Sequence, residues 1–460
     1  MNKTFRVEKD SMGEIKVPFD ALYQAQTQRA IDNFKISKHE MPKDLIVALA
    51  YIKQASAKTN AELGTLNNNI ADAIIKAAKY IIDGQYHDQF PIDVFQTGSG
   101  TSTNMNANEV LATLASQILN EKVSPNDHVN MGQSSNDVIP TSIQVSAVMT
   151  TESLLMPALT HLTKTLRNKQ KELEGIVKTG RTHLMDAMPI TFSQELSGWE
   201  AQIQHASQSI ASTMEFVRAL GQGGTAVGTG INAHSCFAAD FCHNLSQLSG
   251  LSFEPSDNFY FNLSCQDSII SLSGQLKTLA VALIKISNDL RWMNSGPLAG
   301  LGEIELKALQ PGSSIMPGKV NPVIPEAVAM ASAQVIGNDT TITIAGQSGN
   351  FQLNVMLPVI AYNLLESIHL LTNSCISLAD KAIEPFKVRQ DNIDKTLAKN
   401  PILITVLNPI LGYLKTAEIA EKAYKEGRNV IDVAEEETNL SRSELENYFD
   451  PKTLTNGGMA

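Results

Sequence analysis

Seven apolar residues recur at alternating intervals of three and four along the segment DSIISLSGQLKTLAVALIKISNDLRWM, residues 267–293. A stripe of this kind is the pattern of a long helix that packs along a seam against other helices. The segment carries few charges, so we expect several neighbouring helices to enclose it. The stripe consists of Ile269, Leu272, Leu276, Leu279, Leu283, Ile286 and Leu290.

Four further segments show long helical periodicity, which is typical of long bundles. They cover residues 138–172, 193–219, 325–346 and 355–380. Together with 267–293 they predict five long central helices. Strand patterns are scarce, and only FRVEKDSMGEIKV near the start and IEPFKV near residue 388 could each give a short strand. The sequence therefore predicts a mainly α fold.

Shorter helical patterns flank the central segments and predict separate domains. The expected domains are an N-terminal helical domain over residues 1–133, a central long-helix bundle over 134–390 and a small C-terminal helical domain over 391–460. In the last of these, TAEIAEKAYKEG ends on Gly427, a C-terminal glycine signal. The sequence SRSE, from Ser441 to Glu444, predicts a capping box at the start of another helix.

The charge balance excludes some partners. A formal net charge of -11 argues against nucleic acid. Residues 340–365 carry no charge, but the glycines, glutamines and asparagines of GQSGNFQLN favour a buried interior segment over a membrane span. The opening MNKTFRVEKD lacks the apolar run of a secretory signal. We therefore expect a cytoplasmic protein with neither a membrane nor a nucleic-acid partner.

The four cysteines form no CxxC pair, which fits a reducing compartment and requires no disulfide. The stretch HSCFAADFCH holds His234, Cys236, Cys242 and His243, whose spacings match no zinc pattern. We therefore expect no metal site.

Four polar stretches lie between the helical patterns. They are TGSGTSTN (97–104), GQSSNDVIPTS (132–142), GRTHLMDAMP (180–189) and GSSIMPGKVNPV (312–323). Capping is one interpretation, with Ser135 or Asp137, Asn321, and Thr101 or Thr103 as N-caps. Capping is compatible with a binding role, because a helix N-terminus presents free N–H groups and partial positive charge. Several such ends that converge would bind a dianion.

Other chemistries fit the same residues poorly. The glycines of TGSGTST and GQGGTAVGTG form neither GxGxxG nor a P-loop ending in GK[ST], which argues against nucleotide binding. Ser313 and Ser314 lie outside a GxSxG motif, so a serine hydrolase is not indicated.

The four polar stretches resemble the shared blocks of the fumarase, aspartase and argininosuccinate lyase superfamily. GSSIMPGKVNP matches its signature Gly-Ser-x-x-Met-x-x-Lys-x-Asn, and the resemblance covers nearly the whole chain. EKDSMGEIKVP, GGTAVGTGINAH, SGNFQLNV and AEIAEKAYKEG look like class II, iron-independent fumarases more than aspartases. The resemblance implies an all-α, three-domain fold whose central five-helix bundle assembles into the core of a homotetramer, and it implies no cofactor.

The resemblance also implies an activity, the reversible anti hydration of fumarate to L-malate in the tricarboxylic acid cycle. The reaction passes through a C3 carbanion stabilised as an aci-carboxylate. By the same resemblance Ser313, on a mobile loop, removes the C3 proton, His183 activates the water added at C2, and Glu326 orients this histidine. The implied substrate-binding positions are Ser99, Gly100, Thr101, Ser134, Ser135, Asn136, Thr182, Lys319 and Asn321.

One stretch departs from the family pattern. Class II fumarases commonly carry a second anion site reading His-Pro-Asn-Asp, with an arginine shortly before it. Here NEKVSPND has Ser124 in place of the histidine and Glu121 where a cation is expected. A glutamate would repel a dicarboxylate. We therefore expect poor substrate binding at this second anion site, which consists of Ser124, Pro125, Asn126 and Asp127.

Two alternatives stay open. An aspartase would add ammonia rather than water to the same fumarate in almost the same site, and dependence on ammonium would identify it. A non-catalytic structural protein on this scaffold, like the crystallins of the superfamily, would gain support if Ser313 or His183 were missing. Both residues are present.

Overall fold

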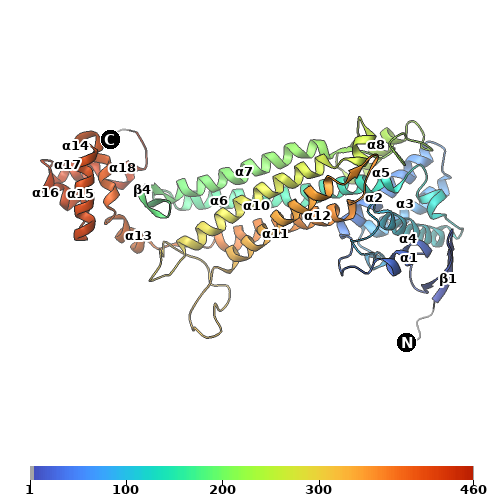
Figure 1. Cartoon of the computed structure of the whole chain (residues 1–460), viewed down its shortest axis with the longest axis horizontal. Helices are drawn as coiled ribbons and strands as arrows, with labels where there is room; N and C mark the ends of the chain where they lie inside the picture. The colour runs from blue at the N-terminus through green and yellow to red at the C-terminus, as the bar shows by residue number, and fades with distance from the viewer. Residues whose placement is uncertain (1–4, 459–460) are drawn as a thin grey trace. The chain divides into compact units, whose positions relative to one another are not determined.

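The computed structural model describes residues 5–458, and it is dominated by helices (Figure 1). Contacts divide it into two compact units. Unit 1 comprises residues up to Pro157 together with Ala206–Ala280 and Ser332–Thr372, and unit 2 comprises Ala158–His205, Val281–Ala331 and the residues from Asn373 onward. The long helices are α5 (Ser135–Thr150), α6 (Met156–Glu172), α7 (Phe192–Val217), α10 (Asp267–Met293), α11 (Val323–Gly346) and α12 (Leu357–Leu378).

The long helices confirm the predicted helical fold. A short π-helical turn, Thr151–Leu155, joins α5 to α6, so the two together cover the first predicted long segment. Every residue of the predicted stripe on α10 has a relative exposure of 0%, because the stripe lies along the packed side of the helix. The seam that the heptad pattern predicted on α10 is therefore buried.

Polar contacts link neighbouring bundle helices within each unit. In unit 1, Ser273 and Lys277 of α10 donate to the carboxylate of Asp339 on α11, over 2.8 and 2.6 Å. In unit 2, Arg167 of α6 donates to Glu200 of α7 over 2.5 Å. These contacts add polar links between helices whose packed faces also bury many apolar side chains.

Unit 1 also contains the shorter helices of the N-terminal region and a β-hairpin. Glu109 on α4 accepts hydrogen bonds from the backbone N–H groups of Gln24, Gln26 and Thr27 at the start of α1. A buried carboxylate thus satisfies the free N–H groups of a helix that has no side-chain cap of its own. The elements are β1 (Phe5–Asp10), β2 (Gly13–Pro18), α1 (Ala25–Asn33), α2 (Lys43–Glu62), α3 (Asn68–Ile82), α4 (Thr101–Leu119), α8 (Phe237–Ser249) and α9 (Phe259–Ser264).

Unit 2 includes a C-terminal group of short helices around an apolar core of Leu403, Leu407, Ile419, Val433 and Leu445. The predicted helix signals are confirmed. Gly427 ends α15 with φ 62°, and Ser441 and Glu444 form a capping box on α17. The helices are α13 (Gln390–Leu397), α14 (Asn408–Leu411), α15 (Tyr413–Glu426), α16 (Val430–Glu437), α17 (Arg442–Tyr448) and α18 (Pro451–Leu454).

Strands are short and paired in twos. The predicted strands near residues 5 and 388 are present, but the polar stretch around His183, which was expected to be a loop, is instead an antiparallel hairpin of β3 (Val177–Thr182) and β4 (Met185–Thr191). The remaining pairs are β5 (Ala219–Leu220) with β6 (Glu254–Pro255), β7 (Ile304–Glu305) with β10 (Lys387–Val388), and β8 (Gly349–Asn350) with β9 (Leu353–Asn354). The three-domain division at residues 133 and 390 stays a prediction.

By length and composition alone, α10 is apolar enough to cross a membrane. The most apolar 18-residue window of α10 has a mean hydropathy of 1.5, and 50% of this window is buried within the protein. The core helix of a bundle has the same properties, so α10 is weak evidence for a membrane span.

Candidate active site

The first polar stretch forms the N-terminus of α4 in unit 1. Gly100 is the N-cap residue with φ 70° and offers no side-chain cap, so the prediction that Thr101 or Thr103 caps this helix is wrong. Thr101 is the first helical residue, and its hydroxyl shares a 2.8 Å hydrogen bond with that of Ser99. The Thr103 N–H donates to Gln96 Oε1 over 3.0 Å, so only N–H groups ahead of Thr103 could serve a ligand at this helix start.

Gly98 allows this turn to approach another backbone closely. The Gly98 carbonyl accepts from Leu357 N over 3.0 Å, and a Cβ at Gly98 would lie 1.7 Å from the carbonyl oxygen of Val355. Only glycine fits such a contact. The start of α12 therefore fixes the position of the loop before α4.

The second polar stretch forms the N-terminus of α5. Ser134 is the N-cap, rather than Ser135 or Asp137, and Asp137 completes a capping box by accepting from Ser134 N over 2.9 Å. Ser135 Oγ accepts a hydrogen bond from Asn104 Nδ2 over 2.9 Å, and Asn136 Nδ2 donates to the carbonyl of Ala226 over 2.8 Å. The Ser135 contact joins α5 to α4 close to the starts of both helices.

A buried lysine lies beneath these two helix ends. Lys53 of α2 has a relative exposure of 0%, and its ammonium donates to Asn130 Oδ1 and Gln133 Oε1, each over 2.9 Å. Asn104 Nδ2 also donates to Asn130 Oδ1, over 3.2 Å. Amide side chains thus connect Lys53 to Ser135. The sequence analysis did not single out Lys53.

Burial shifts two titrating groups in this region. Desolvation lowers the pKa of the Lys53 ammonium to about 7, while the negative charge of Asp137 acts in the opposite direction. Burial likewise raises the pKa of the Asp137 carboxyl to about 6, although the backbone N–H groups of Ser134, Thr225 and Gly223 favour its ionised form. A fully buried lysine, whose burial disfavours its charged form, therefore lies behind the region expected to bind carboxylates.

The third stretch places His183 at a hairpin tip in unit 2. His183 and Leu184 form the two-residue turn of β3–β4, with φ values of 56° and 61°. Left-handed values at both positions match the twist of the flanking strands. Thr182, at the end of β3, and His183 are both exposed. The hairpin therefore presents the expected water-activating histidine at an exposed position.

The fourth stretch is an extended loop that leads into α11. Ser313 Oγ accepts hydrogen bonds from the backbone N–H groups of Ile315 and Met316, over 3.3 and 3.1 Å. Asn321 Nδ2 donates to the carbonyl of Gly312 over 2.6 Å and so ties the two ends of the loop together. Hydrogen bonds donated to a hydroxyl oxygen favour its deprotonated form. The loop thus supplies donors at the atom expected to act as base.

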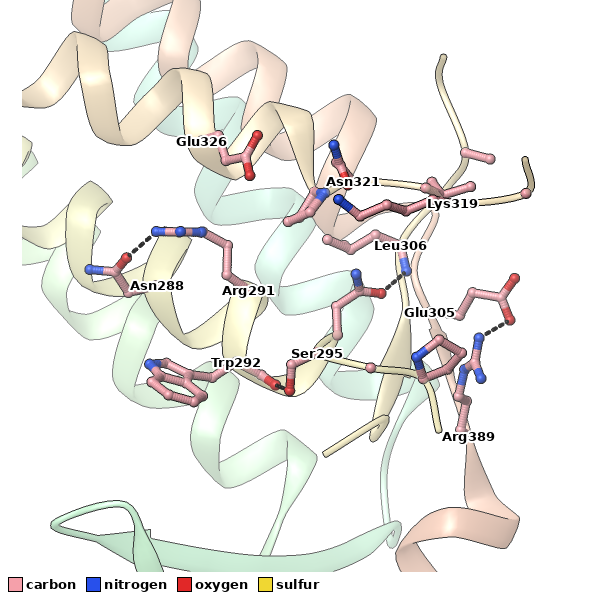
Figure 2. Close-up of a pocket in the computed structure, with 17 residues that line it drawn as sticks. Asn288, Arg291, Trp292, Ser295, Glu305, Leu306, Lys319, Asn321, Glu326 and Arg389 are labelled. Carbon is pink, nitrogen blue, oxygen red and sulfur yellow. Dashed lines mark hydrogen bonds and ion pairs between the residues drawn. The ribbon is translucent and has the colours of Figure 1, made fainter. Parts of the chain in front are cut away.

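A pocket of about 690 Å³ in unit 2 brings several predicted residues together (Figure 2). Lys319, Asn321 and Glu326 line it, with Arg291 of α10 and Arg389 on other walls. Ser313 lines an adjoining hollow of about 420 Å³, which shares Lys319 with the pocket. Two arginines, a lysine and an amide give the pocket the donors that a carboxylate needs.

The predicted site residues fall into two sets. Within the described residues, no hydrogen bond joins His183 to Glu326, so the orienting role of Glu326 stays a prediction. Unit 1 carries Ser99, Gly100, Thr101, Ser134, Ser135 and Asn136, whereas unit 2 carries Thr182, His183, Ser313, Lys319, Asn321 and Glu326.

The second anion site forms a short π-helical turn, Pro125–Val129, capped by Ser124. Ser124 Oγ accepts from Asp127 N over 3.1 Å and donates to Asp127 Oδ2 over 2.7 Å. The backbone N–H of Ser124 donates to Nδ1 of His128, a histidine that sequence reasoning did not single out. The polar groups of Ser124 thus bond within the turn.

Known families and relatives match nearly the whole chain. The family described as "Lyase" matches residues 13–337, and "Fumarase C C-terminus" matches residues 403–456. A "Fumarate hydratase class II 2" from Pseudomonas aeruginosa is 59% identical, and the alignment covers 99% of both chains. A "Fumarate hydratase class II" from Bacillus cereus is 45% identical, with 98% of both chains covered.

Solved structures of related lyases also match this chain. The class II fumarase from Schistosoma mansoni superposes with a TM-score of 0.96 at 39% identity, covering 98% of this chain and 99% of that one. A fumarate lyase:delta crystallin from Brucella melitensis, bound to cobalt, gives 0.94 at 40% identity and covers 98% of this chain and 100% of its own. The chain therefore belongs to the lyase family that includes the class II fumarate hydratases, and within it to the class II fumarases.

Proposed function

We propose that the chain is a fumarate hydratase that adds water reversibly to fumarate to give L-malate. Family membership supports this activity, and one structural observation carries it: Ser313 Oγ accepts from two loop N–H groups and lines the same hollow as Lys319. A serine acts as a general base only where its alkoxide is stabilised, and fixed amide donors with a nearby ammonium provide that stabilisation.

Fumarate and malate are dicarboxylates, and the chain offers donors for both carboxylate groups. The start of α4 contributes Ser99, Gly100 and Thr101, and the start of α5 contributes Ser134, Ser135 and Asn136. Lys319 and Asn321 add an ammonium and an amide ahead of α11. Helix N-termini and charge-assisted hydrogen bonds both favour bound carboxylates.

The reaction can be followed in the direction of dehydration. The Ser313 alkoxide takes the proton from C3 of malate, and the electron pair moves into the neighbouring carboxylate to form the aci-carboxylate. The C2–O bond then breaks, the C2=C3 bond forms, and His183 protonates the departing hydroxide, so that fumarate and water result. Thr182 lies beside this histidine, and Glu326 orients it. Donors aimed at the carboxylate oxygens lower the barrier where negative charge develops.

We infer that the active form is a homotetramer. Large apolar side chains remain exposed on the bundle helices of one chain, as expected for a surface that packs against other copies. Val281 of α10 has a relative exposure of 53%, and Met330 and Ile344 of α11 have 70% and 53%. Near the site, Leu184 and Ile315 have 61% and 84%. Other subunits would cover these surfaces and complete the site.

We propose a cytoplasmic location, because all four cysteines, at positions inside residues 5–458, are free thiols, as is usual in a reducing compartment. The second anion site, Ser124 to Asp127, is proposed to bind the substrate poorly, because the Ser124 hydroxyl and its N–H already have partners within the turn.

The test of the proposed function follows the absorbance of fumarate. We expect absorbance to fall in buffer without ammonium, with L-malate as the product, and added ammonium to leave the rate unchanged. An aspartase would consume fumarate only with ammonium, and a structural protein would consume none. Either outcome would contradict the proposal.

A further inference from the structure

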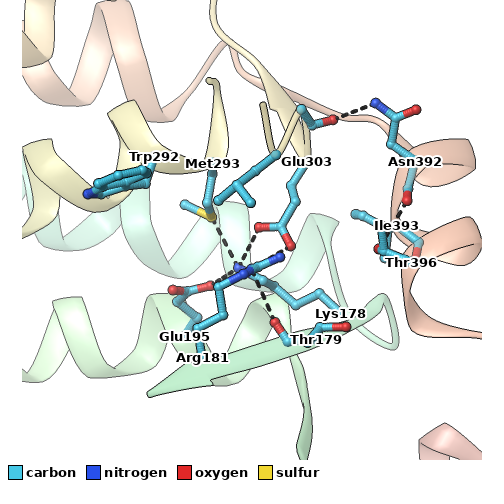
Figure 3. A network of polar contacts seen from close by, with 12 residues as sticks. Lys178, Thr179, Arg181, Glu195, Trp292, Met293, Glu303, Asn392, Ile393 and Thr396 are labelled. Carbon is cyan, nitrogen blue, oxygen red and sulfur yellow. Dashed lines mark hydrogen bonds and ion pairs between the residues drawn. The ribbon is translucent and has the colours of Figure 1, made fainter. Parts of the chain in front are cut away.

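Among residues 5–458, three lysines are buried, and Lys53 of α2 differs from the other two in its partners. Both lysines of unit 2 pair with carboxylates. Figure 3 shows Lys178 beside Glu303, with Nζ 3.0 Å from Oε2. Lys169 likewise lies 3.0 Å from Glu172. Lys53 forms no ion pair with a carboxylate in the described part of the chain. Burying a lysine without a direct counter-ion is costly, so its position indicates a role other than ion pairing.

The partners of Lys53 are amide oxygens. Its Nζ donates to Asn130 Oδ1 and to Gln133 Oε1, each over 2.9 Å. A protonated lysine can only donate, so Asn130 must turn its oxygen, and not its NH2 group, toward Lys53. The NH2 group of Asn130 donates instead to the carbonyl of Gln133, over 3.1 Å. Lys53 therefore determines which way round the amide of Asn130 lies.

The orientation of Asn130 determines that of Asn104 on α4. Asn104 Nδ2 donates to Asn130 Oδ1 over 3.2 Å and to Ser135 Oγ over 2.9 Å. If the amide of Asn104 were turned over, its Oδ1 would face Asn130 Oδ1, and two acceptors cannot bond to each other. We call the chain of hydrogen bonds from Lys53 through Asn130 and Asn104 to Ser135 the amide relay.

Two asparagines of α4 keep their NH2 groups toward Asn130 although this leaves their own oxygens unpaired. Asn108 Nδ2 also donates to Asn130 Oδ1, over 3.1 Å. The Oδ1 atoms of Asn104 and Asn108 are buried and have no hydrogen-bond partner within residues 5–458. Unpaired buried acceptors are unfavourable, so a stronger requirement must hold both amides in this orientation. The oxygen that Asn130 turns toward Lys53 supplies that requirement.

The amide relay decides what the Ser135 hydroxyl offers to a ligand. Its oxygen accepts from Asn104, and its proton makes no hydrogen bond to any described residue. Ser135 is only partly buried, at the start of α5. An ionised carboxylate only accepts hydrogen bonds, so it binds a hydroxyl whose proton is free. Every residue of the relay belongs to unit 1 of one chain, so the arrangement is the same whichever subunit supplies Ser313.

We propose that Lys53 is a positioning residue that sets the direction of the hydrogen bond between Asn104 and Ser135, so that the Ser135 hydroxyl donates to a carboxylate of the substrate. The inference rests on the proposed function, since Ser135 belongs to the proposed carboxylate site. Lys53 does not touch the substrate. Without it, Asn130 and Asn104 can both turn over, and the Ser135 proton can then bond inward to Asn104 Oδ1 instead of to the ligand.

The experiment measures the affinity for succinate, a four-carbon dicarboxylate that has neither the double bond of fumarate nor the hydroxyl of malate and is not turned over. Calorimetry gives the Kd of the wild type, Lys53→Met, Ser135→Ala and the double variant Lys53→Met/Ser135→Ala. We expect Lys53→Met to weaken succinate binding about 10-fold, the size expected for one hydrogen bond to a charged group. Its KM for fumarate should rise similarly while kcat changes less than about threefold, because the lost contact serves ground state and transition state alike.

The double variant distinguishes the amide relay from a general effect of the lysine charge on a dianion. If Lys53 acts through Ser135, adding Lys53→Met to Ser135→Ala should change the Kd for succinate less than about twofold, because the effects of coupled residues do not add. A loss equal to the product of the two single losses would show that Lys53 acts on the ligand independently of Ser135, and would overturn the inference. Wild-type affinity in Lys53→Met would overturn it as well.

Lys169→Met is the matched control, since it removes another buried lysine by the same substitution. It should lower Tm and keep the wild-type Kd for succinate, and a loss of affinity as large as that of Lys53→Met would also overturn the inference. If Lys53→Met does not fold, Asn130→Leu breaks the next link of the relay and is combined with Ser135→Ala in the same way. A wild type that does not hydrate fumarate would contradict the proposed function instead, so the two failures are distinguishable.

Discussion

The ammonium of Lys53 donates a hydrogen bond to the side-chain oxygen of Gln133 over 2.9 Å, in the interior of unit 1. Gln133 directly precedes the N-cap of α5, so a buried positive charge lies next to a helix end that is proposed to bind a carboxylate. The charge of Lys53 and the partial positive charge of the helix end would act in the same direction on a dianion.

Lys53 should make the stability of the protein depend on pH. Its folded pKa of about 7 lies below the usual value of 10.5, so the unfolded chain binds more protons between these values. The free energy of unfolding should therefore rise as the pH increases above about 7. The folded pKa of Asp137 is about 6, above the usual carboxyl value of 3.8, so the folded chain binds more protons between these two values. The free energy of unfolding should therefore fall as the pH rises from about 3.8 to about 6.

The prediction for Lys53→Met is that the rise in stability above pH 7 disappears. Melting temperatures measured from pH 6 to pH 9 should increase for the wild type relative to the variant. Lys58→Met, on the same helix but at a position with a side-chain exposure of 32%, should keep the wild-type dependence. Parallel curves for wild type and Lys53→Met would show that Lys53 does not titrate as described.

The sequence predicted features that depend on local spacing. The α10 stripe, the Gly427 C-terminus and the Ser441 capping box each arise from residues within a few turns of one another. The β3–β4 hairpin was missed because its segment is polar and lacks a clear alternation of apolar residues. A lysine such as Lys53 normally indicates a solvated helix face, and its acceptors, Asn130 and Gln133, are distant in sequence. The long-range contacts that bury Lys53 therefore could not be predicted from local sequence spacing.

Ser313→Ala should abolish most of the activity and keep the fold. Because positioned proton transfer contributes about 10²- to 10⁴-fold, we expect kcat to fall by about 10² or more, while substrate binding and Tm stay close to wild type. Ser314→Ala is the matched control, since the neighbouring hydroxyl has the same chemistry. A near-wild-type rate for Ser313→Ala would place the base elsewhere, with Ser314 as the first candidate.

Gly98→Ala should displace the start of α4. A Cβ at this position would lie 1.7 Å from the carbonyl oxygen of Val355, which is backbone and cannot rotate away. We expect a lower Tm and a raised KM, because the helix end proposed to bind a carboxylate would shift. At Gly198, on an exposed part of α7, an added Cβ meets no atom within 4 Å, so Gly198→Ala should leave KM unchanged. An unchanged Tm and KM in Gly98→Ala would contradict the close approach.

Activity should survive the removal of metals. The proposed mechanism uses serine, histidine, lysine, amide and backbone donors only, and needs no Lewis acid at the developing charge. We expect full activity after exhaustive dialysis against a chelator, measured as fumarate hydration. Activity that is lost on dialysis and restored by a divalent ion would overturn the metal-free mechanism.

The shared site of a homotetramer can be tested by mixing inactive variants. Ser135→Ala removes a residue at the start of α5, and Ser313→Ala removes the proposed base. If the two residues of one site come from different subunits, unfolding and refolding the variants together should leave about a quarter of the sites with neither change. Activity should then reappear in the mixture. Each variant refolded alone gives the baseline, and size measurement establishes that tetramers have formed. A mixture of intact tetramers that stays as inactive as its parents would mean that Ser135 and Ser313 of one site belong to the same chain.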